Sequence, residues 1–448
     1  MARQYWVETL GCPKNQVDSD KLVGTLVAEG LEPAASPDAA DVVVVNTCAF
    51  IGEARQESVD TILALDQGRK DGAELVVTGC MAERYGQELA DALPEVQAVA
   101  PFGASVSGSG SATTAVPVTI GLKPGSPAAT PEEPAGAVPA FDLLELPRPP
   151  AEAPWAYVKV AEGCDRACGF CAIPSFRGKQ RSRSVESILA EVDGLGVREV
   201  VLVAQDLAAF GRDQGRGTRR IVPLVQAVAD RVDWVRLLYL YPSDLTDELI
   251  DTMCATGVPY FDLSLQHVSA PHLRRMRRWG SGEKFIERIE AIRRREPGAT
   301  FRSNFIVGYP GETEEDHDRL LDFVGQVELD WCGFFGYSEE EGTYGADLEP
   351  KVPRSLRDER LRELRDLQDR ITTKGRIDRI GSAATVLVDT PGQARSVAEA
   401  PEIDGIITVD DDLEPGRFHT VTIVDAEGPD LIATAAGRSI ERWDGALP

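Results

Sequence analysis

Three cysteines stand close together near the middle of the chain, where Cys164, Cys168 and Cys171 form a C-x3-C-x2-C motif. Three thiolates this close in sequence can hold three irons of one [4Fe–4S] cubane and leave the fourth iron without a protein ligand. An iron with an open position can bind a small molecule that must react at the metal. Structural zinc is the alternative, but zinc ribbons use two C-x2-C pairs and four ligands, which this motif lacks. The motif therefore predicts an iron–sulfur cluster that takes part in a reaction.

Three other cysteines are far apart in sequence, but Cys12, Cys48 and Cys80 each follow directly on an apolar, strand-like run. The carboxyl ends of parallel strands lie along one edge of a sheet, so three such loops can converge there. A second cluster with an open iron is one interpretation. Three small buried thiols are the other, since cysteines are among the most buried residues. Cys254 and Cys332 have no partners in the pattern, and we predict both to be buried structural thiols.

Polar residues follow most of the strand-like runs in the second half of the chain. They are Gln205, Asp206, Tyr241, Gln266, His267, Gly308, Ser338 and Glu340. In (β/α) barrels the carboxyl ends of the strands build the active site, which makes these residues candidates for contacts with a cofactor or substrate. His267 could equally be a structural histidine, and the glycine loop at Gly308 and Gly311 is weak evidence by itself.

Basic residues gather in two places along the chain. The first group, which closely follows the cysteine motif, comprises Arg177, Lys179, Arg181 and Arg183. These side chains either meet the carboxylate of a cofactor or substrate, with Arg177 and Arg181 as candidates, or form a solvated basic loop. The second group, Arg274, Arg275, Arg277 and Arg278, is a local patch that is compatible with RNA binding.

The elements that would position these residues follow two α/β patterns and one β pattern. Strand-like runs at 5–10, 42–45 and 75–78 alternate with helical stretches at 18–29, 53–66 and 81–93, which indicates a parallel sheet covered by helices. Six further strand-like runs, at 157–160, 199–203, 235–240, 261–265, 303–307 and 331–337, are separated by helical stretches. They predict a partial (β/α) barrel, or less favourably an open doubly wound sheet.

A long helix with a capping-box-like start at Ser355 and Asp358 is predicted after the barrel. Its apolar positions fall on one face, so we expect it to pack against the barrel. Short β-rich runs at 384–388, 405–409, 420–424 and 431–435 then predict a small antiparallel β-barrel. A Gly-, Ser- and Pro-rich stretch at 103–150 separates the first pattern from the second and reads as a linker.

Composition limits the classes of protein to consider. No apolar run approaches the roughly 18 residues of a membrane helix, and the first residues do not resemble a signal peptide. We therefore expect a cytoplasmic protein, in which eight cysteines favour metal or redox roles over disulfides. The formal net charge of −26 disfavours a general nucleic-acid binder and favours a basic partner.

The nonapeptide that contains the cysteine motif, GCDRACGFC from Gly163 to Cys171, resembles the radical S-adenosylmethionine signature C-x3-C-x-aromatic-C. Phe170 stands in the aromatic place, which in that superfamily lies against the adenine. Two three-cysteine sets ahead of a β-rich tail resemble the methylthiotransferase branch. The resemblance covers nearly the whole chain except the stretch 103–150.

The methylthiotransferase resemblance implies a flavodoxin-like domain at 1–103, a linker at 104–150, a radical barrel at 151–373 and a TRAM domain at 374–448. It also implies two [4Fe–4S] clusters, with the auxiliary cluster on Cys12, Cys48 and Cys80 carrying the sulfur to be inserted. S-adenosylmethionine then serves as both methyl donor and radical source. On this basis Phe170, Gln205, Gln266, His267 and Gly308 are predicted to contact the cofactor, and Arg177, Arg181 and Glu340 the substrate.

Two substrate branches are known for such enzymes: an adenosine in tRNA, and an aspartate β-carbon in small-subunit ribosomal protein twelve. The segment from Lys374 to Pro448 holds seven Lys/Arg and fourteen Asp/Glu, a net charge of −7. Such a surface would repel a phosphate backbone and attract a basic ribosomal protein.

The amino-acid sequences of four motifs favour the ribosomal-protein branch, known as RimO. The segments that resemble it are LQH from Leu265, FIVGYPGET from Phe305, YSEEEGT from Tyr337 and APEIDG from Ala400. Two positions depart from the family, since Ser264 stands where proline is more usual and Ala208-Ala209 replaces polar residues.

We therefore predict a ribosomal-protein aspartate methylthiotransferase that works with an external electron donor and no membrane. The tRNA-modifying branch is the first alternative. A non-catalytic iron–sulfur protein for electron transfer or sensing is the second, although electron carriers usually ligate all four irons with protein groups.

Overall fold

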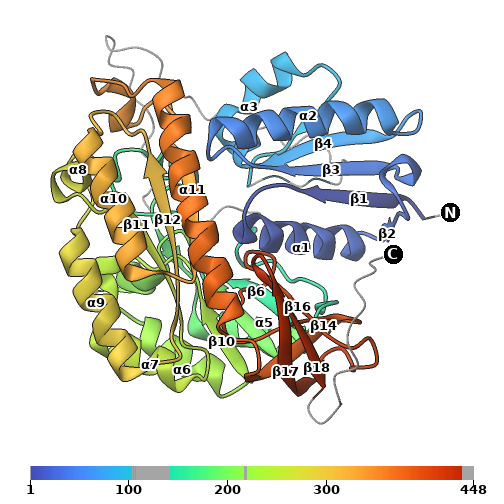
Figure 1. Cartoon of the computed structure of the whole chain (residues 1–448). Coiled ribbons are helices and arrows are strands. Elements are labelled where there is room, and N and C mark those ends of the chain that lie inside the picture. The colour runs from blue at the N-terminus through green and yellow to red at the C-terminus, as the bar shows by residue number, and fades with distance from the viewer. Residues whose placement is uncertain (1, 103, 105, 107–141, 216–218, 436–448) are drawn as a thin grey trace. The chain divides into compact units, whose positions relative to one another are not determined.

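The computed structural model describes residues 2–102, 104, 106, 142–215 and 219–435. These residues form two compact units, the first within residues 1–49 and 53–149 and the second within residues 50–52 and 150–448 (Figure 1). No helix of the described ranges has both the length and the apolar composition that a membrane crossing requires.

The first unit is a five-stranded parallel sheet with the order β2-β1-β3-β4-β5. Its strands are β1 (Gln4–Thr9), β2 (Glu32–Pro33), β3 (Val42–Thr47), β4 (Glu74–Gly79) and β5 (Ala98–Val99). Its helices are α1 (Pro13–Ala28), α2 (Gly52–Gly68) and α3 (Cys80–Ala92), with α1 on one face and α2 and α3 on the other (Figure 1). The valine run of β3 is fully buried, as a central parallel strand covered on both faces requires. The predicted flavodoxin-like arrangement is confirmed.

Most of the predicted linker, residues 103, 105 and 107–141, lies outside the described residues. Its described end packs against the first unit, because Leu143 joins the apolar core that α1 forms with the sheet. The Lys21 ammonium donates a hydrogen bond of 2.5 Å to the Leu144 carbonyl, and Arg148 pairs with Asp20 at 2.5 Å. Residues 142–149 are therefore packed chain rather than the open linker that their composition indicates.

The second unit contains six parallel strands in two three-stranded sheets, ordered β10-β9-β6 and β11-β12-β13. An isolated parallel bridge between Leu240 and Leu263 joins the two sheets. The strands are β6 (Trp155–Lys159), β9 (Glu199–Val203), β10 (Trp234–Leu237), β11 (Tyr260–Gln266), β12 (Thr300–Val307) and β13 (Trp331–Gly336). The covering helices are α5 (Val185–Leu195), α6 (Ile221–Ala229), α7 (Asp247–Ala255), α9 (Gly282–Arg295) and α10 (Glu314–Val327). The prediction of a partial (β/α) barrel is confirmed.

The long helix α11 spans Arg354–Ile377 and packs along β13 and α10 (Figure 1). Leu361 and Leu364 are buried on this face, as expected from their spacing. The predicted capping box is wrong: the helix begins one residue before Ser355, and the preceding Pro353 offers no side-chain cap. Asp358 pairs instead with Arg357 at 3.3 Å.

The C-terminal elements close into a small barrel with the order β14-β15-β16-β18-β17. They are β14 (Ala383–Thr390), β15 (Gln393–Arg395), β16 (Ile407–Thr408), β17 (Phe418–Glu427) and β18 (Asp430–Ala435). Val386, Ile407, Val421 and Ile423 fill its interior. The predicted small β-barrel is confirmed, with two differences: β16 and β18 pair in parallel, and the three-residue β15 was not predicted.

The segment 396–404, between β15 and β16, contacts the larger barrel near the beginnings of its strands. Tyr157 of β6 donates a hydrogen bond of 2.7 Å to the Pro401 carbonyl, and the Trp331 indole donates one of 2.8 Å to the Ala398 carbonyl. Tyr260, the first residue of β11, donates to the Asp404 carboxylate. The two barrels are therefore joined by hydrogen bonds from residues of β6, β11 and β13 to the segment 396–404.

A buried ion network accompanies these hydrogen bonds. Glu199 of β9 pairs with Arg236 at 2.8 Å and with Arg395 of the small barrel at 2.7 Å, and all three side chains are at most 2% exposed. Arg395 also pairs with Asp389 at 2.6 Å. Burial opposes the charge of Glu199, but Arg395 and Arg236 hold the pKa of its carboxyl group below the usual value. The network satisfies charges that would otherwise be costly inside the protein.

Substituting Glu199→Gln should leave two buried guanidinium groups without their shared anion and destabilise the second unit by about 3 kcal/mol. The neighbouring Arg198→Gln, which removes a half-exposed pair with Asp233, is the matched control and should cost less than about 1 kcal/mol. Chemical unfolding of both variants measures the difference. Equal losses would contradict a structural role for the network.

Candidate functional site

The loop that carries Cys164, Cys168 and Cys171 follows β6 and the short strand β7 (Ala161–Glu162). Gly163 begins the loop at a φ of +74°, and a Cβ there would lie 2.2 Å from the Lys179 carbonyl oxygen. Only glycine fits this close approach of two chain segments. The Cys164 amide then donates to the Gly178 carbonyl at 3.1 Å, which fixes where the first thiol lies.

A second glycine holds the other end of the cysteine loop. The Gly169 amide donates to the Met276 carbonyl at 2.8 Å, and the Gly169 carbonyl accepts from Gly345 at 2.6 Å. A Cβ at Gly169 would lie 2.5 Å from the Tyr309 hydroxyl oxygen. Phe170, between Cys168 and Cys171 in the sequence, is half-buried and packs against the core of the larger barrel.

The three thiols of this loop suit an iron–sulfur cluster. N–H groups point at two of the sulfurs, from the Arg166 amide to Cys164 Sγ and from Arg278 Nη1 to Cys168 Sγ, each at 3.4 Å. Burial, together with the neighbouring thiols, raises the pKa of Cys164 to about 11 and that of Cys171 to about 12. Bound iron would displace these protons, because a coordinating thiol is deprotonated. The donor set therefore fits an iron–sulfur cluster.

Arg166, within the cysteine motif, ties the loop to the ends of two strands. It pairs with Asp206 after β9 at 2.6 Å and with Asp244 after β10. Asp244 also accepts from Arg219 at 2.5 Å. Asp206 was among the predicted polar residues, whereas Arg166 and Asp244 were not. Their partners are distant in sequence, so only the position of Arg166 inside the motif could have indicated its role.

Gln205 and Arg177, which were predicted to contact the cofactor and the substrate, both bind the Glu162 carboxylate. Glu162 accepts from Gln205 Nε2 at 2.7 Å and pairs with Arg177 at 2.8 Å and with Lys159 at 2.7 Å. Burial opposes its charge, but Arg177 and Lys159 hold the pKa of Glu162 well below the usual value. Arg177 therefore serves Glu162 and is buried. Arg181, on the short strand β8 (Arg181–Ser182), is half-buried.

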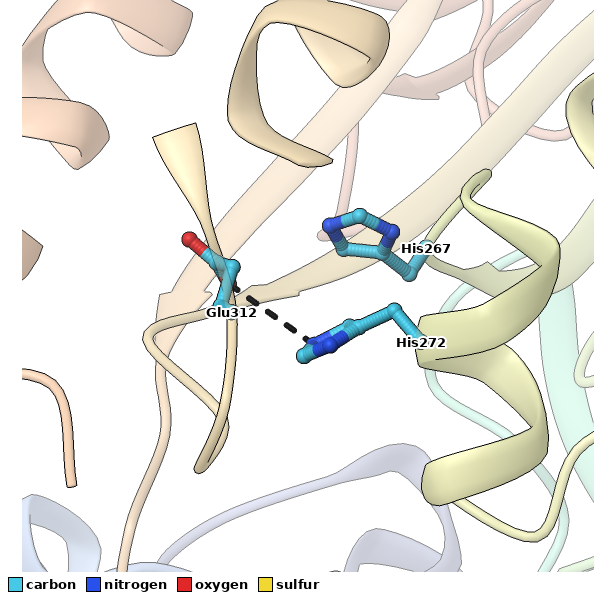
Figure 2. A group of neighbouring side chains, drawn as sticks. All are labelled: His267, His272 and Glu312. Atoms are coloured by element: carbon cyan, nitrogen blue, oxygen red, sulfur yellow. Dashed lines mark ion pairs between the residues drawn. The ribbon is translucent and has the colours of Figure 1, made fainter. Parts of the chain in front are cut away.

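His267 lies in the protein interior, beside His272 and across from Glu312 (Figure 2). The ring centroids of the two histidines are 4.5 Å apart, and His272 Nε2 lies 4.0 Å from a Glu312 oxygen. Glu312 already accepts hydrogen bonds from Arg360 at 2.8 Å and from the Gly308 amide at 2.7 Å. His272 comes from α8 (Ala270–Arg275), so the cluster ties α8 and the end of β11 to the loop after β12.

The remaining predicted contacts lie at strand ends. Gln266 ends β11 with a φ of +70°, next to a register shift in the pairing with β12, and its side chain is half-buried. Gly308 has a φ of +82°, and a Cβ there would lie 2.7 Å from Arg357 Cγ. Glu340 is buried and accepts from the Ser338 hydroxyl at 2.6 Å. Glycine at 308 and the carboxylate at 340 therefore have structural uses, and contacts with a ligand stay predictions.

In the first unit, Cys12, Cys48 and Cys80 follow β1, β3 and β4, which are adjacent parallel strands. They therefore lie along one edge of the sheet, as the sequence pattern predicts. Gly11, with a φ of +98°, allows close approach, because a Cβ there would lie 2.8 Å from Cys48 Cβ.

Asn15 connects the three cysteine loops and was not predicted from the sequence. Its side-chain amide donates to the Leu10 carbonyl at 2.9 Å and to the Thr47 carbonyl at 3.0 Å, just before Cys12 and Cys48. Its amide oxygen lies 3.7 Å from Cys80 Sγ. One fully buried side chain thus touches all three loops. Three thiols gathered in this way suit a second iron–sulfur cluster.

Three regions of the chain match known families. Residues 4–101 match the Uncharacterized protein family UPF0004, residues 158–324 the Radical SAM superfamily and residues 380–436 the TRAM domain. The ribosomal protein uS12 methylthiotransferase RimO of Moorella thermoacetica is 42% identical over 93% of this chain and 95% of its own length. The chain belongs to the RimO family. The protein of the same description from Cutibacterium acnes is 40% identical over 96% of this chain and 97% of its own.

The fold of this RimO family member also resembles a solved radical S-adenosylmethionine methyltransferase, TsrM, from Kitasatospora setae. The two share 15% identity over 75% of this chain and 73% of the other, with a TM-score of 0.50. This similarity shows a related fold.

Burial lowers the pKa of His272 to about 4 from its usual 6.5, with Arg275 and Arg360 adding to the effect against the opposing charge of Asp316. The folded chain therefore takes up this proton only at lower pH than the unfolded chain. The stability due to neutral His272 is fully present above pH 6.5 and is lost as the pH falls toward 4.

Substituting His272→Leu removes this proton linkage. Between pH 7 and pH 5 the variant should lose about 2 kcal/mol less unfolding free energy than the parent chain. Urea unfolding at several pH values measures both. Parallel stability curves for variant and parent would contradict the assignment.

Proposed function

We propose that the chain methylthiolates the β-carbon of an aspartate in small-subunit ribosomal protein twelve. The observation that carries this conclusion is the near full-length similarity to RimO proteins, which are described as ribosomal protein uS12 methylthiotransferases. The two gathered cysteine sets provide the two metal sites that the reaction needs. A purely electron-carrying role is disfavoured, because each set offers three thiols rather than four protein ligands.

Cys164, Cys168 and Cys171 hold one [4Fe–4S] cluster, and Cys12, Cys48 and Cys80 hold the other. When bound, the first cluster and S-adenosylmethionine supply a 5′-deoxyadenosyl radical, and the second carries the sulfur that is inserted. Arg166, Asp206 and Asp244 keep the first cysteine loop against the barrel. Asn15 keeps the second set of loops together.

A basic protein suits this chain better than tRNA does. The C-terminal segment from Lys374 carries a net charge of −7, from seven Lys/Arg and fourteen Asp/Glu. In the basic patch that kept the RNA alternative open, Arg275 donates to the carbonyls of Pro310 and Glu349, and Arg278 is buried beside Cys168. Arg275 and Arg278 are therefore engaged within the protein, and only Arg274 and Arg277 of this patch are exposed for contact with a phosphate backbone.

The proposed division of labour follows the chain. Residues 1–103 carry the sulfur, 104–150 form a connection whose described end packs on the first unit, 151–373 form the radical barrel, and 374–448 form the TRAM domain. A ribosomal protein as the substrate supports a cytoplasmic location. Reduction of the first cluster requires an external electron donor.

Deletion of the gene should remove a methylthio group from the ribosomal protein and leave tRNA unchanged. Mass spectrometry of small-subunit proteins and of tRNA nucleosides, from deleted and complemented strains, measures both. Loss of a methylthio mark from tRNA, with the ribosomal protein unaltered, would assign the chain to the other branch.

Two cysteine variants separate the roles of the clusters. Cys168→Ala should abolish release of 5′-deoxyadenosine, whereas Cys48→Ala should retain that release and lose sulfur insertion. Cys254→Ala, at a half-buried thiol on α7, is the control and should keep both activities. Normal methylthiolation by Cys48→Ala would refute the auxiliary-cluster assignment.

A further inference from the structure

The turn at the C-terminal end of α8 places Arg278 next to the cysteine loop. The Arg277 amide donates to the Arg274 carbonyl at 3.0 Å, and the Arg278 amide donates to the Leu273 carbonyl at 2.8 Å. This pair of bonds is a Schellman motif, in which the residue after the cap is left-handed. That residue is Arg277, at a φ of +55°, although glycine is usual there. The turn sends the next side chain toward Cys168.

The Arg278 guanidinium is held from three sides. Nη1 donates to Cys168 Sγ at 3.4 Å, and Nη2 donates to the Ser264 carbonyl. The guanidinium carbon lies 4.1 Å from the centre of the Tyr241 ring, and the residue is 8% exposed. This geometry fixes the charge beside one sulfur of the loop.

Arg278 differs from its neighbour Arg166 in how its charge is compensated. Arg166 lies over the same Tyr241 ring, at 3.8 Å, and pairs with two aspartates. For Arg278, no carboxylate of the described residues lies within ion-pair distance, and its Nε finds no acceptor among them. A buried cation without an anion is costly. Three thiolates on a cluster with a net negative charge would supply that anion.

We propose that Arg278 is a positioning residue that holds the Cys168 thiolate and sets the reduction potential of the cluster on Cys164, Cys168 and Cys171. This inference rests on the proposed function. One electron from a low-potential donor takes the [4Fe–4S] core from 2+ to 1+, and no other bond or proton changes. The fixed positive charge and its N–H···S bond favour the more negative, reduced state.

The full chain with both clusters reconstituted provides the test, by reductive titration followed with electron paramagnetic resonance. The signal that changes when S-adenosylmethionine is added identifies the relevant cluster, and potentials are then read without S-adenosylmethionine. In Arg278→Gln the ratio of reduced to oxidised cluster at a fixed potential should fall about tenfold, which is about 59 mV for one electron. Arg278→Lys should restore most of the loss, and the exposed Arg274→Gln should match the parent.

An unchanged potential in Arg278→Gln with full iron content would overturn the proposal. Weaker binding of S-adenosylmethionine at an unchanged potential would also overturn it, and would assign Arg278 to the cofactor instead. Arg278→Gln could lose the cluster altogether. In that case, a cluster that is retained in Arg278→Lys with a potential near that of the parent supports the role of the charge. Loss of this cluster from both variants, with the other cluster retained, contradicts it. Because no ribosomal substrate is present, these outcomes are independent of which molecule is methylthiolated.

Discussion

Parallel pairing of strands is the constraint on which both metal sites depend. In the first unit, β1, β3 and β4 are adjacent and run in the same direction, so cysteines far apart in sequence come to one edge. The edge alone would leave three separate loops. The side chain of Asn15 connects them, because its amide reaches the carbonyls that precede Cys12 and Cys48. A neutral side chain with both donors and an acceptor can do this without placing a negative charge beside three thiolates.

In the larger barrel, arginines, a lysine and carboxylates hold the cysteine loop in place. The cysteine loop in this unit is one continuous segment, so the loop must be anchored rather than assembled. Arg166 anchors it through Asp206 and Asp244 at the ends of two strands. Glu162, just before the loop, is held by Arg177 and Lys159. Arg166 and Glu162 each have two partners of opposite charge, which offset the desolvation cost of a lone ion.

Residue type and spacing were sufficient to predict the cysteine sets, the order of the α/β elements and the small C-terminal barrel. Apolar runs reveal strands because strands buried on both faces must be apolar. The three-residue β15 gave no such signal, since one of its residues is the buried Arg395. Partners such as Asp244 for Arg166 could not be predicted, because pairing between distant loops depends on the folded geometry. Arg177 was expected to contact a ligand but pairs with Glu162 inside the protein. This pairing also depends on the folded geometry and could not be predicted from the sequence.

The change of sequence pattern near Lys374 suggests an appended module, yet Glu199, Arg236 and Arg395 share one buried ion network across it. A TRAM domain transplanted from an unrelated protein would not bring Arg395, and Glu199 would keep Arg236 as its one buried partner in this network. The two barrels are therefore expected to have been inherited together, and to melt as one cooperative block. An exchange of the small barrel between relatives would therefore have to include the matching residues of β9 and β10, Glu199 and Arg236.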